Sequence, residues 1–182
     1  MKGNQKKKII LIGYRATGKS TVARELAKRW SFDWVDLDVW IENKQGASIA
    51  EIFANYGEDY FRDLEERAVA DVVTQTRPLV VATGGGAPLR SASREIMKAN
   101  GVVVWLTASI ETIAKRMSDD VTTKTRRPAL TDAKSPVAEI ERVLTQREPY
   151  YRDAASFIVD TDGKSVDEIV LEIVDSAPDF LM

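Results

Sequence analysis

The stretch GYRATGKS, residues 13–20, matches the phosphate-binding pattern G-x-x-x-x-G-K-[ST] at every fixed position. An apolar, mostly β-branched segment at 8–12 predicts a buried strand before it, and residues 21–29 predict a helix after it. This order points backbone N–H groups and the positive end of a helix dipole at an anion. A chance match on a glycine turn is the alternative, and it does not explain the flanking pattern. The stretch therefore predicts binding of a nucleoside triphosphate, without naming the acceptor.

Side chains within this phosphate loop (residues 13–20) have distinct predicted roles. Lys19 is expected to neutralise the β- and γ-phosphates, and the Ser20 hydroxyl is expected to ligate Mg²⁺. The glycines allow the backbone to turn tightly around a phosphate. The residues expected to contact the nucleotide here are Ala16, Thr17, Gly18, Lys19, Ser20 and Thr21.

Composition narrows the class of protein and the available chemistry. The 182 residues suit one domain, and 44% hydrophobic with 30% charged residues is typical of a soluble globular protein. The net charge of −2 and the lack of a basic stripe disfavour nucleic-acid binding. The chain has no cysteine and no histidine, so a general base must be a carboxylate, a lysine or a tyrosine.

The interpretation of the first residues and the lengths of the apolar segments predict a protein of the cytoplasm. Residues 1–8 are basic, and we interpret them as a solvated leader because removal of a signal peptide would destroy the phosphate loop. No segment approaches the length of a membrane span. Residues 176–182 are expected to form a frayed tail. One domain without an obvious spare apolar patch favours a monomer.

A second strand is predicted within residues 32–38, with Asp36 and Asp38 at its carboxyl end. Residues two apart on a strand point to the same side, so both carboxylates are expected to face the phosphate loop. One is suited to hold Mg²⁺ through water and the other to accept a proton from a hydroxyl. The alternative is a polar strand end that leads into a turn.

Further candidate residues each have a simpler interpretation. Arg62 lies early on an amphipathic helix, where a surface ion pair with neighbouring glutamates is favoured. The three glycines 84–86 follow a strand at 78–83 and suggest close approach to a ligand, or else a flexible turn. The basic segment 118–132 predicts a mobile lid over the nucleotide, or else an ordinary surface loop.

Five short apolar segments alternate with helical segments, which predicts an α/β fold with a doubly wound parallel sheet. The later strands are expected at 78–83, 102–106 and 157–160. Helices are expected at 21–29, 39–44, 48–56, 58–76, 91–100, 109–117, 135–148 and 165–174, with a separate turn or helix from Pro149.

Taken together, these segments resemble shikimate kinases over residues 9–174. The resemblance rests on a set of motifs and on their order, and the combination is more specific than the phosphate loop alone. The motifs are Gly13-x4-Gly18-Lys19-Ser20-Thr21, Asp36-x-Asp38, Ser48-Ile49-x-Glu51, Gly57-Glu58-x-x-Phe61-Arg62-x-x-Glu65, Gly84-Gly85-Gly86, Arg127-Pro128-x-Leu130 and Arg147-x-x-Tyr150-Tyr151.

The resemblance implies one P-loop kinase domain over residues 1–182. Its expected architecture is a three-layer α/β/α, nucleoside-monophosphate-kinase-like fold with a five-stranded parallel sheet in the order 2-3-1-4-5 and a mobile lid. The implied activity is ATP-dependent phosphorylation of the 3-hydroxyl of shikimate, a step toward chorismate and the aromatic amino acids. ATP and Mg²⁺ are the implied cofactors.

The resemblance also implies roles for individual residues. Asp38 is expected to bind shikimate hydroxyls and to act as the base, while Asp36 lies near Mg²⁺ through water. Arg62 and Arg147 are expected to clamp the shikimate carboxylate, and two arginines are a natural receptor for a small acid. The residues expected to approach the ring hydroxyls are Gly84, Gly85 and Gly86.

The nucleotide side is implied less sharply. Arg127 is the implied lid arginine for the ATP phosphates, although Arg126 beside it is an alternative. Lys164 is implied to lie near adenine. Arg15 departs from the usual small or apolar residue and adds a positive charge to the phosphate loop. The alternatives are a related small-metabolite kinase, such as a gluconate kinase, or a nucleotide-binding module without catalysis.

Overall fold

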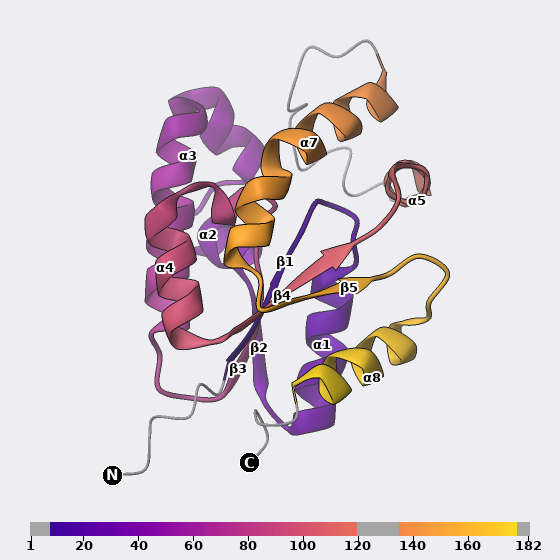
Figure 1. The fold of residues 1–182 in the computed structure, drawn as a ribbon. Helices are drawn as coiled ribbons and strands as arrows, with labels where there is room; N and C mark the ends of the chain where they lie inside the picture. Colours follow the sequence, from indigo (N-terminus) through magenta and orange to yellow (C-terminus); the bar gives the residue numbers. More distant parts are fainter. Residues whose placement is uncertain (1–7, 120–134, 178–182) are drawn as a thin grey trace.

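The computed structural model describes residues 8–119 and 135–177. Its five strands form one parallel sheet in the order β2-β3-β1-β4-β5, which confirms the predicted topology (Figure 1). The strands are β1 (Lys8–Ile12), β2 (Asp33–Asp36), β3 (Leu79–Ala82), β4 (Val102–Thr107) and β5 (Phe157–Asp160).

Helices cover both faces of this sheet, as the three-layer prediction requires. One face packs against α2, α3, α4 and α7, and the other packs against α1 and α8. The described helices are α1 (Lys19–Trp30), α2 (Leu37–Gln45), α3 (Ile49–Val73), the 3₁₀ turn η1 (Ala87–Leu89), α4 (Ser91–Asn100), α5 (Ile110–Asp119), α7 (Pro136–Ala154) and α8 (Val166–Ser176).

The central strand β1 is completely buried on both sides. Ile10 and Ile12 enter the core beneath α3, and Ile9 and Leu11 enter the core beneath α1 and α8. Successive side chains of a strand point to opposite faces, so an apolar run without alternation is what a central parallel strand requires. Because all strands run the same way, their carboxyl ends form one edge that carries the phosphate loop.

The second strand ends earlier than predicted. β2 stops at Asp36 and α2 begins at Leu37, so Asp38 lies in the first turn of a helix rather than on a strand. The Asp36 carboxylate accepts hydrogen bonds from the N–H groups of Asp38 and Val39, at 3.0 and 3.4 Å. An aspartate that caps a helix satisfies amides that would otherwise lack partners. The prediction that Asp38 ends a strand was therefore wrong, because the chain turns into a helix directly after Asp36.

The long helix α3 is broken where the sequence predicted. Gly57 has φ 80° and ψ 177°, which kinks the helix between the predicted segments 48–56 and 58–76. The Ser48 side chain accepts from the N–H of Glu51, and the Glu51 carboxylate accepts from the N–H of Ser48, which completes a capping box. The helix ends at Val73, three residues before the predicted end.

The carboxyl-terminal helices run further than predicted. α7 continues through Pro149 to Ala154, although proline removes one N–H from the helix. Tyr151 and Ala154 are completely buried, and their packing against the sheet offsets that loss. α8 extends to Ser176, and Ala177 is also buried, so the predicted tail begins at least two residues too early. Most of the predicted lid and residues 178–182 lie outside the described residues.

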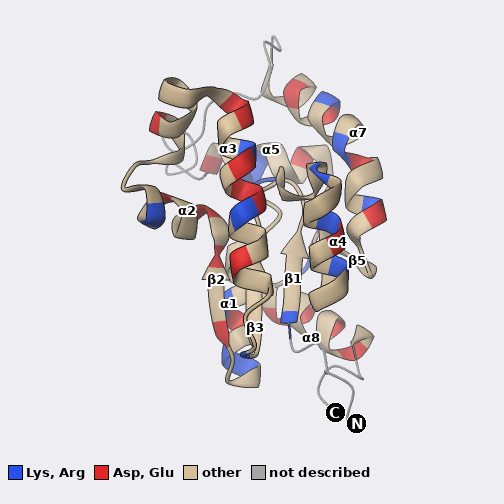
Figure 2. Ribbon diagram, turned by 90° about the vertical axis from the view of Figure 1, so that its left-hand side faces the viewer, with Lys and Arg blue, Asp and Glu red and all other residues tan. Residues whose placement is uncertain are grey.

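Charged residues of both signs lie along the outer side of α3 (Figure 2). Arg90 reaches this helix and pairs with Asp63 at 2.6 Å and with Glu66 at 3.3 Å. Exposed pairs of this kind contribute about 1 kcal/mol or less. Over residues 8–119 and 135–177, no helix has both the length and the apolar character needed to cross a membrane.

Gly13, at the start of the phosphate loop, allows a test of how the loop is packed. A Cβ atom on Gly13 would lie 2.4 Å from the carbonyl oxygen of Leu106, whereas nothing lies within 4 Å of one on Gly163. Both glycines have positive φ, so alanine at either position is strained by about 1 kcal/mol or more. Only Gly13→Ala adds a backbone clash, which costs about 1–3 kcal/mol further.

We therefore expect Gly13→Ala to lower the free energy of unfolding clearly more than the matched control Gly163→Ala. Urea denaturation of both variants measures the difference. Equal losses for the two variants would contradict the tight packing of the loop against β4.

Candidate active site

The phosphate loop closes around its own lysine. Gly13, Ala16 and Gly18 have φ of 141°, 62° and 90°, and these values turn the backbone sharply between β1 and α1. The Lys19 ammonium donates to the carbonyl oxygens of Gly13 and Tyr14, at 3.0 and 2.7 Å. Lys19 is nearly buried, so a strong positive charge lies inside a ring of backbone groups. A phosphate is a stronger acceptor than these neutral carbonyls and suits this position.

The predicted metal-binding residues lie together beside the loop. The Ser20 hydroxyl donates to the Asp36 carboxylate at 2.5 Å. Hydroxyl and carboxylate oxygens are the hard ligands that Mg²⁺ prefers, so the pair fits that ion. Among the described residues, no group of three or more acidic side chains forms a complete metal cage. A site of this kind takes its remaining ligands from water and from the phosphates of the nucleotide.

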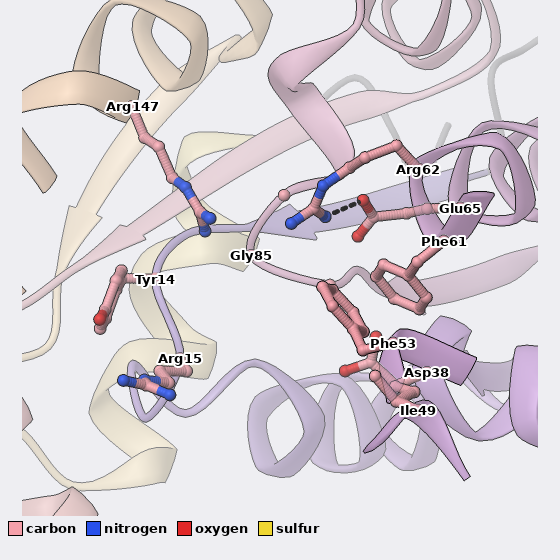
Figure 3. Close-up of a pocket in the computed structure, with 12 residues that line it drawn as sticks. Tyr14, Arg15, Asp38, Ile49, Phe53, Phe61, Arg62, Glu65, Gly85 and Arg147 are labelled. Carbon is pink, nitrogen blue, oxygen red and sulfur yellow. Dashed lines mark hydrogen bonds and ion pairs between the residues drawn. The ribbon is translucent and has the colours of Figure 1, made fainter. Parts of the chain in front are cut away.

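A cavity lies next to the phosphate loop, where the carboxyl edge of the sheet meets α3 and α7 (Figure 3). It brings together every residue that was predicted to bind the acceptor. Its lining also includes aromatic and charged residues for which the sequence predicted no role. The predicted residues are Asp38, Arg62, Gly84, Gly85, Gly86 and Arg147, and the others are Tyr14, Arg15, Ile49, Phe53, Phe61 and Glu65.

Arg62 makes the ion pairs that the helix pattern suggested, but inside the cavity rather than on the surface. Its guanidinium donates to Glu58 at 2.9 Å and to Glu65 at 2.5 Å. Only 9% of Arg62 is exposed, so the prediction of a surface position was wrong. The two carboxylates fix the guanidinium in one orientation at the cavity wall.

Glu65 is a buried carboxylate, which the sequence offered only as one possible partner of Arg62 in a surface ion pair. Burial raises the pKa of Glu65, against the opposing attraction of Arg62 and Arg147. One of its oxygens holds Arg62, and the other has no hydrogen-bond partner within the part of the chain that the structure describes. The i, i+3 spacing of Arg62 and Glu65 on a helix was the signal that they are paired.

Gly84 and Gly86 make room for charged side chains, and Gly85 lies in contact with a third. A Cβ atom on Gly84 would lie 2.3 Å from Glu65 Oε1, and one on Gly86 would lie 1.9 Å from Arg62 Nη1. On Gly85 it would lie 3.4 Å from Arg147 Nη1. All three glycines are buried, and Gly85 and Gly86 lie in a turn, so the segment is a turn packed against other side chains rather than an exposed one. Their common property is the absence of a side chain where arginine and glutamate groups converge.

Arg147 differs from Arg62 in its charge environment. It lies on α7, is 9% exposed, and forms no ion pair with a carboxylate among the described residues. Glu65 attracts Arg147 without forming an ion pair with it, so an acidic ligand would further offset the cost of burying this cation. Phe53 and Phe61 stack with ring centroids 4.8 Å apart and form an apolar wall of the same cavity. The cavity thus suits a small acid with an apolar ring face.

The turn after β5 is linked to the phosphate loop by Arg116, a residue that the sequence did not single out. Its guanidinium donates to the hydroxyl and carbonyl oxygens of Thr161, at 2.9 and 3.1 Å, and to the Ala16 carbonyl at 3.4 Å. Lys164 in this turn pairs with Glu172 of α8 at 2.6 Å. The predicted lid arginines, Arg126 and Arg127, lie outside the described residues.

Comparison with known proteins identifies the family. A family model described as shikimate kinase matches residues 15–178. This chain belongs to the shikimate kinase family. It is 45% identical over 170 residues to a shikimate kinase of Rhodopirellula baltica, which covers 93% of this chain and 90% of the relative. It is 44% identical to a shikimate kinase of Geobacter metallireducens, over 91% of this chain and 88% of that one.

Solved structures agree with the family assignment. A shikimate kinase from Acinetobacter baumannii in complex with shikimate has a TM-score of 0.87 and 31% identity, over 94% of this chain and 93% of that one. A gluconokinase from Sinorhizobium meliloti has a TM-score of 0.59 with 18% identity, which is a likeness of fold alone. The fold is therefore shared with other kinases, while the sequence likeness places this chain among the shikimate kinases.

Tyr151 ties α7 of this shikimate kinase family member to the glycine turn. Its hydroxyl donates to the Gly85 carbonyl at 2.6 Å, in a completely buried position. Tyr151→Phe leaves that carbonyl without a partner, and we expect the free energy of unfolding to fall by about 1–3 kcal/mol. Urea denaturation measures the loss. The matched control is Tyr150→Phe, because Tyr150 is 39% exposed.

The same residue predicts a dependence on pH. Burial raises the pKa of Tyr151 from its ordinary value of 10 to about 12. The folded state thus favours the neutral phenol, so this stabilisation is complete below pH 10 and is lost as the pH rises toward 12. Stability of Tyr151→Phe should decline less steeply over this range than that of the wild-type protein. Parallel declines would contradict the assignment.

Proposed function

We propose that this protein is a shikimate kinase that transfers the γ-phosphoryl group of ATP to the 3-hydroxyl of shikimate. The product is shikimate 3-phosphate, on the pathway to chorismate and the aromatic amino acids. The observation that carries the proposal is a buried Arg147 in a cavity beside the phosphate loop, with Arg62 and Asp38 in the same wall. Family membership supports it independently.

The acceptor cavity offers a group for each part of shikimate. Arg147 and Arg62 bind the carboxylate, and Arg147 supplies more of the attraction because Arg62 forms ion pairs with two glutamates, whereas Glu65 attracts Arg147 only without an ion pair. The stacked rings of Phe53 and Phe61 pack against the apolar face of the ring. Asp38 and the backbone of the glycine turn bind the ring hydroxyls.

The acceptor cavity adjoins the phosphate loop, because Tyr14 and Arg15 of the loop line it, and this proximity allows phosphoryl transfer. The 3-hydroxyl oxygen forms a bond to the γ-phosphorus while the bond from that phosphorus to the β–γ bridging oxygen breaks, which releases ADP. Asp38 accepts the hydroxyl proton. Lys19 and the loop N–H groups stabilise charge on the phosphates, and little else is required because such reactions depend on positioning.

Ser20 and Asp36 are proposed to hold Mg²⁺ on the nucleotide side, Asp36 through water. When bound, Mg²⁺ neutralises charge on the β- and γ-phosphates. Arg127 is proposed to reach the same phosphates, with Arg126 as the alternative, and Lys164 to lie near adenine. The protein is further proposed to act as a cytoplasmic monomer.

ADP release in a coupled assay tests the function. The purified protein is mixed with ATP and Mg²⁺, alone, with shikimate, or with gluconate as the control acid. We expect stimulation by shikimate and none by gluconate. Stimulation by gluconate alone would overturn the choice of acceptor, and no stimulation by either acid would overturn it as well while the family assignment stands.

Arg147→Ala tests the carboxylate receptor. Removing one partner of a buried charge pair costs about 2 kcal/mol or more, so the KM for shikimate should rise about 30-fold or more. The KM for ATP should change little, because Lys19 and the loop backbone bind the nucleotide. Arg152→Ala is the matched control, since Arg152 is on the same helix but exposed and paired with Glu148 at 2.6 Å. Equal weakening of both substrates by Arg147→Ala would contradict its role.

A further inference from the structure

Arg15 links the phosphate loop to a distant helix. Its guanidinium pairs with the carboxylate of Glu139, which lies in the first turn of α7 and 124 residues further along the chain. Only 12% of the Arg15 side chain and 10% of the Glu139 side chain are exposed. A pair buried this deeply is weak support for stability, since desolvation opposes the attraction. The pair has a stronger effect on the position of α7 relative to the phosphate loop, because the two buried charges must stay in contact.

The neighbouring residue makes a second contact with the same helix. Tyr14 is 1% exposed and packs in a cluster with Ile140 and Val143 of α7 and with Ile113 of α5. Residues 140, 143 and 147 have the i, i+3, i+7 spacing of one helix face. The face of α7 that rests on the phosphate loop is therefore the face that carries Arg147.

We propose that Arg15 and Glu139 are positioning residues for the acceptor. By holding α7 on the phosphate loop, they set the distance between the guanidinium of Arg147 and the phosphates at Lys19. Neither residue needs to touch the reacting atoms. This role rests on the proposed function, because it concerns the alignment of a carboxylate-bearing acceptor with a bound triphosphate.

The proposal has a direct competitor, because Arg15 also lines the acceptor cavity. If Arg15 were itself a ligand for the acid, Glu139 would only compete with the substrate. Removal of Glu139 would then leave the KM for shikimate unchanged or lower it. A positioning pair predicts the opposite, since loss of either partner lets α7 and Arg147 shift.

Kinetics of Glu139→Ala and Arg15→Ala separate these possibilities. We expect the KM for shikimate to rise about tenfold in both variants, because small displacements of a binding group are costly and interacting residues are strongly coupled. The KM for ATP should stay within about twofold. Asp71→Asn is the matched control, since it breaks an exposed pair with Lys44 at 3.0 Å. A rise in the KM of Arg15→Ala alone would assign Arg15 as a direct ligand and overturn the proposal.

The exchanged variant Arg15→Glu/Glu139→Arg sharpens the test. It restores an ion pair between the loop and α7, so a positioning role predicts recovery of most of the shikimate KM. A direct role predicts a further loss, because a carboxylate then faces the acid. In an Arg147→Ala background, Glu139→Ala should add little, because the side chain that it positions is absent. Additive effects in that background would contradict the proposal.

Position can also be measured without any substrate. The chain has no cysteine, so spin labels can be attached to cysteines that replace the exposed residues Arg29 on α1 and Arg142 on α7. The interspin distance distribution should broaden or shift in Glu139→Ala and stay unchanged in Asp71→Asn. An unchanged distribution in Glu139→Ala would overturn the proposal. If shikimate does not stimulate ADP release but the interspin distances shift in Glu139→Ala, the result would count against the proposed function alone.

Discussion

The structure depends on the pairing of the central strand β1 with β3 on one side and β4 on the other. Leu11 is in register with Ala82 and with Val104, so the segments that follow β1 and β3 leave the sheet at the same level. The phosphate loop follows β1 and the three glycines follow β3. Parallel pairing therefore places a site for phosphates beside a site for a second ligand, without any direct link between the two segments.

Charge in the acceptor cavity is arranged unequally between two arginines. Arg62 is compensated by Glu58 and Glu65, so its guanidinium is held in place with little net attraction left for an acid. Arg147 forms no ion pair among the described residues, although Glu65 attracts it, and in the proposed function it provides most of that attraction. Under that proposal, Arg62 supplies rigid orientation and Arg147 supplies most of the charge available to the acid. The glycine turn makes room for this arrangement, because a side chain at Gly84 would clash with Glu65 and one at Gly86 would clash with Arg62.

Local sequence pattern predicted which helices and strands exist, but it placed several of their ends incorrectly, as at β2 and α3. The capping box at Ser48 and the kink at Gly57 follow from residue type and spacing, whereas the strand order was implied by the motif resemblance, and the structure contains all three. Asp38 was expected to face the phosphate loop because of strand geometry. It does line the cavity, but from a helix that Asp36 caps. Burial of the Arg62 pair was missed, since helix spacing alone does not tell which face meets the sheet.

The sequence by itself determined the nucleotide site and the fold class, because contiguous residues form the phosphate loop and the apolar period defines the strands. Motif resemblance added the acceptor and the residues that surround it. Only the tertiary structure decided how those residues share charge: that Glu65 is buried against Arg62, and that Glu139 reaches Arg15 from 124 residues away. The i, i+3 spacing indicates that Arg62 and Glu65 can pair, but their burial and the contact between Arg15 and Glu139 depend on which elements pack together, which local spacing does not encode.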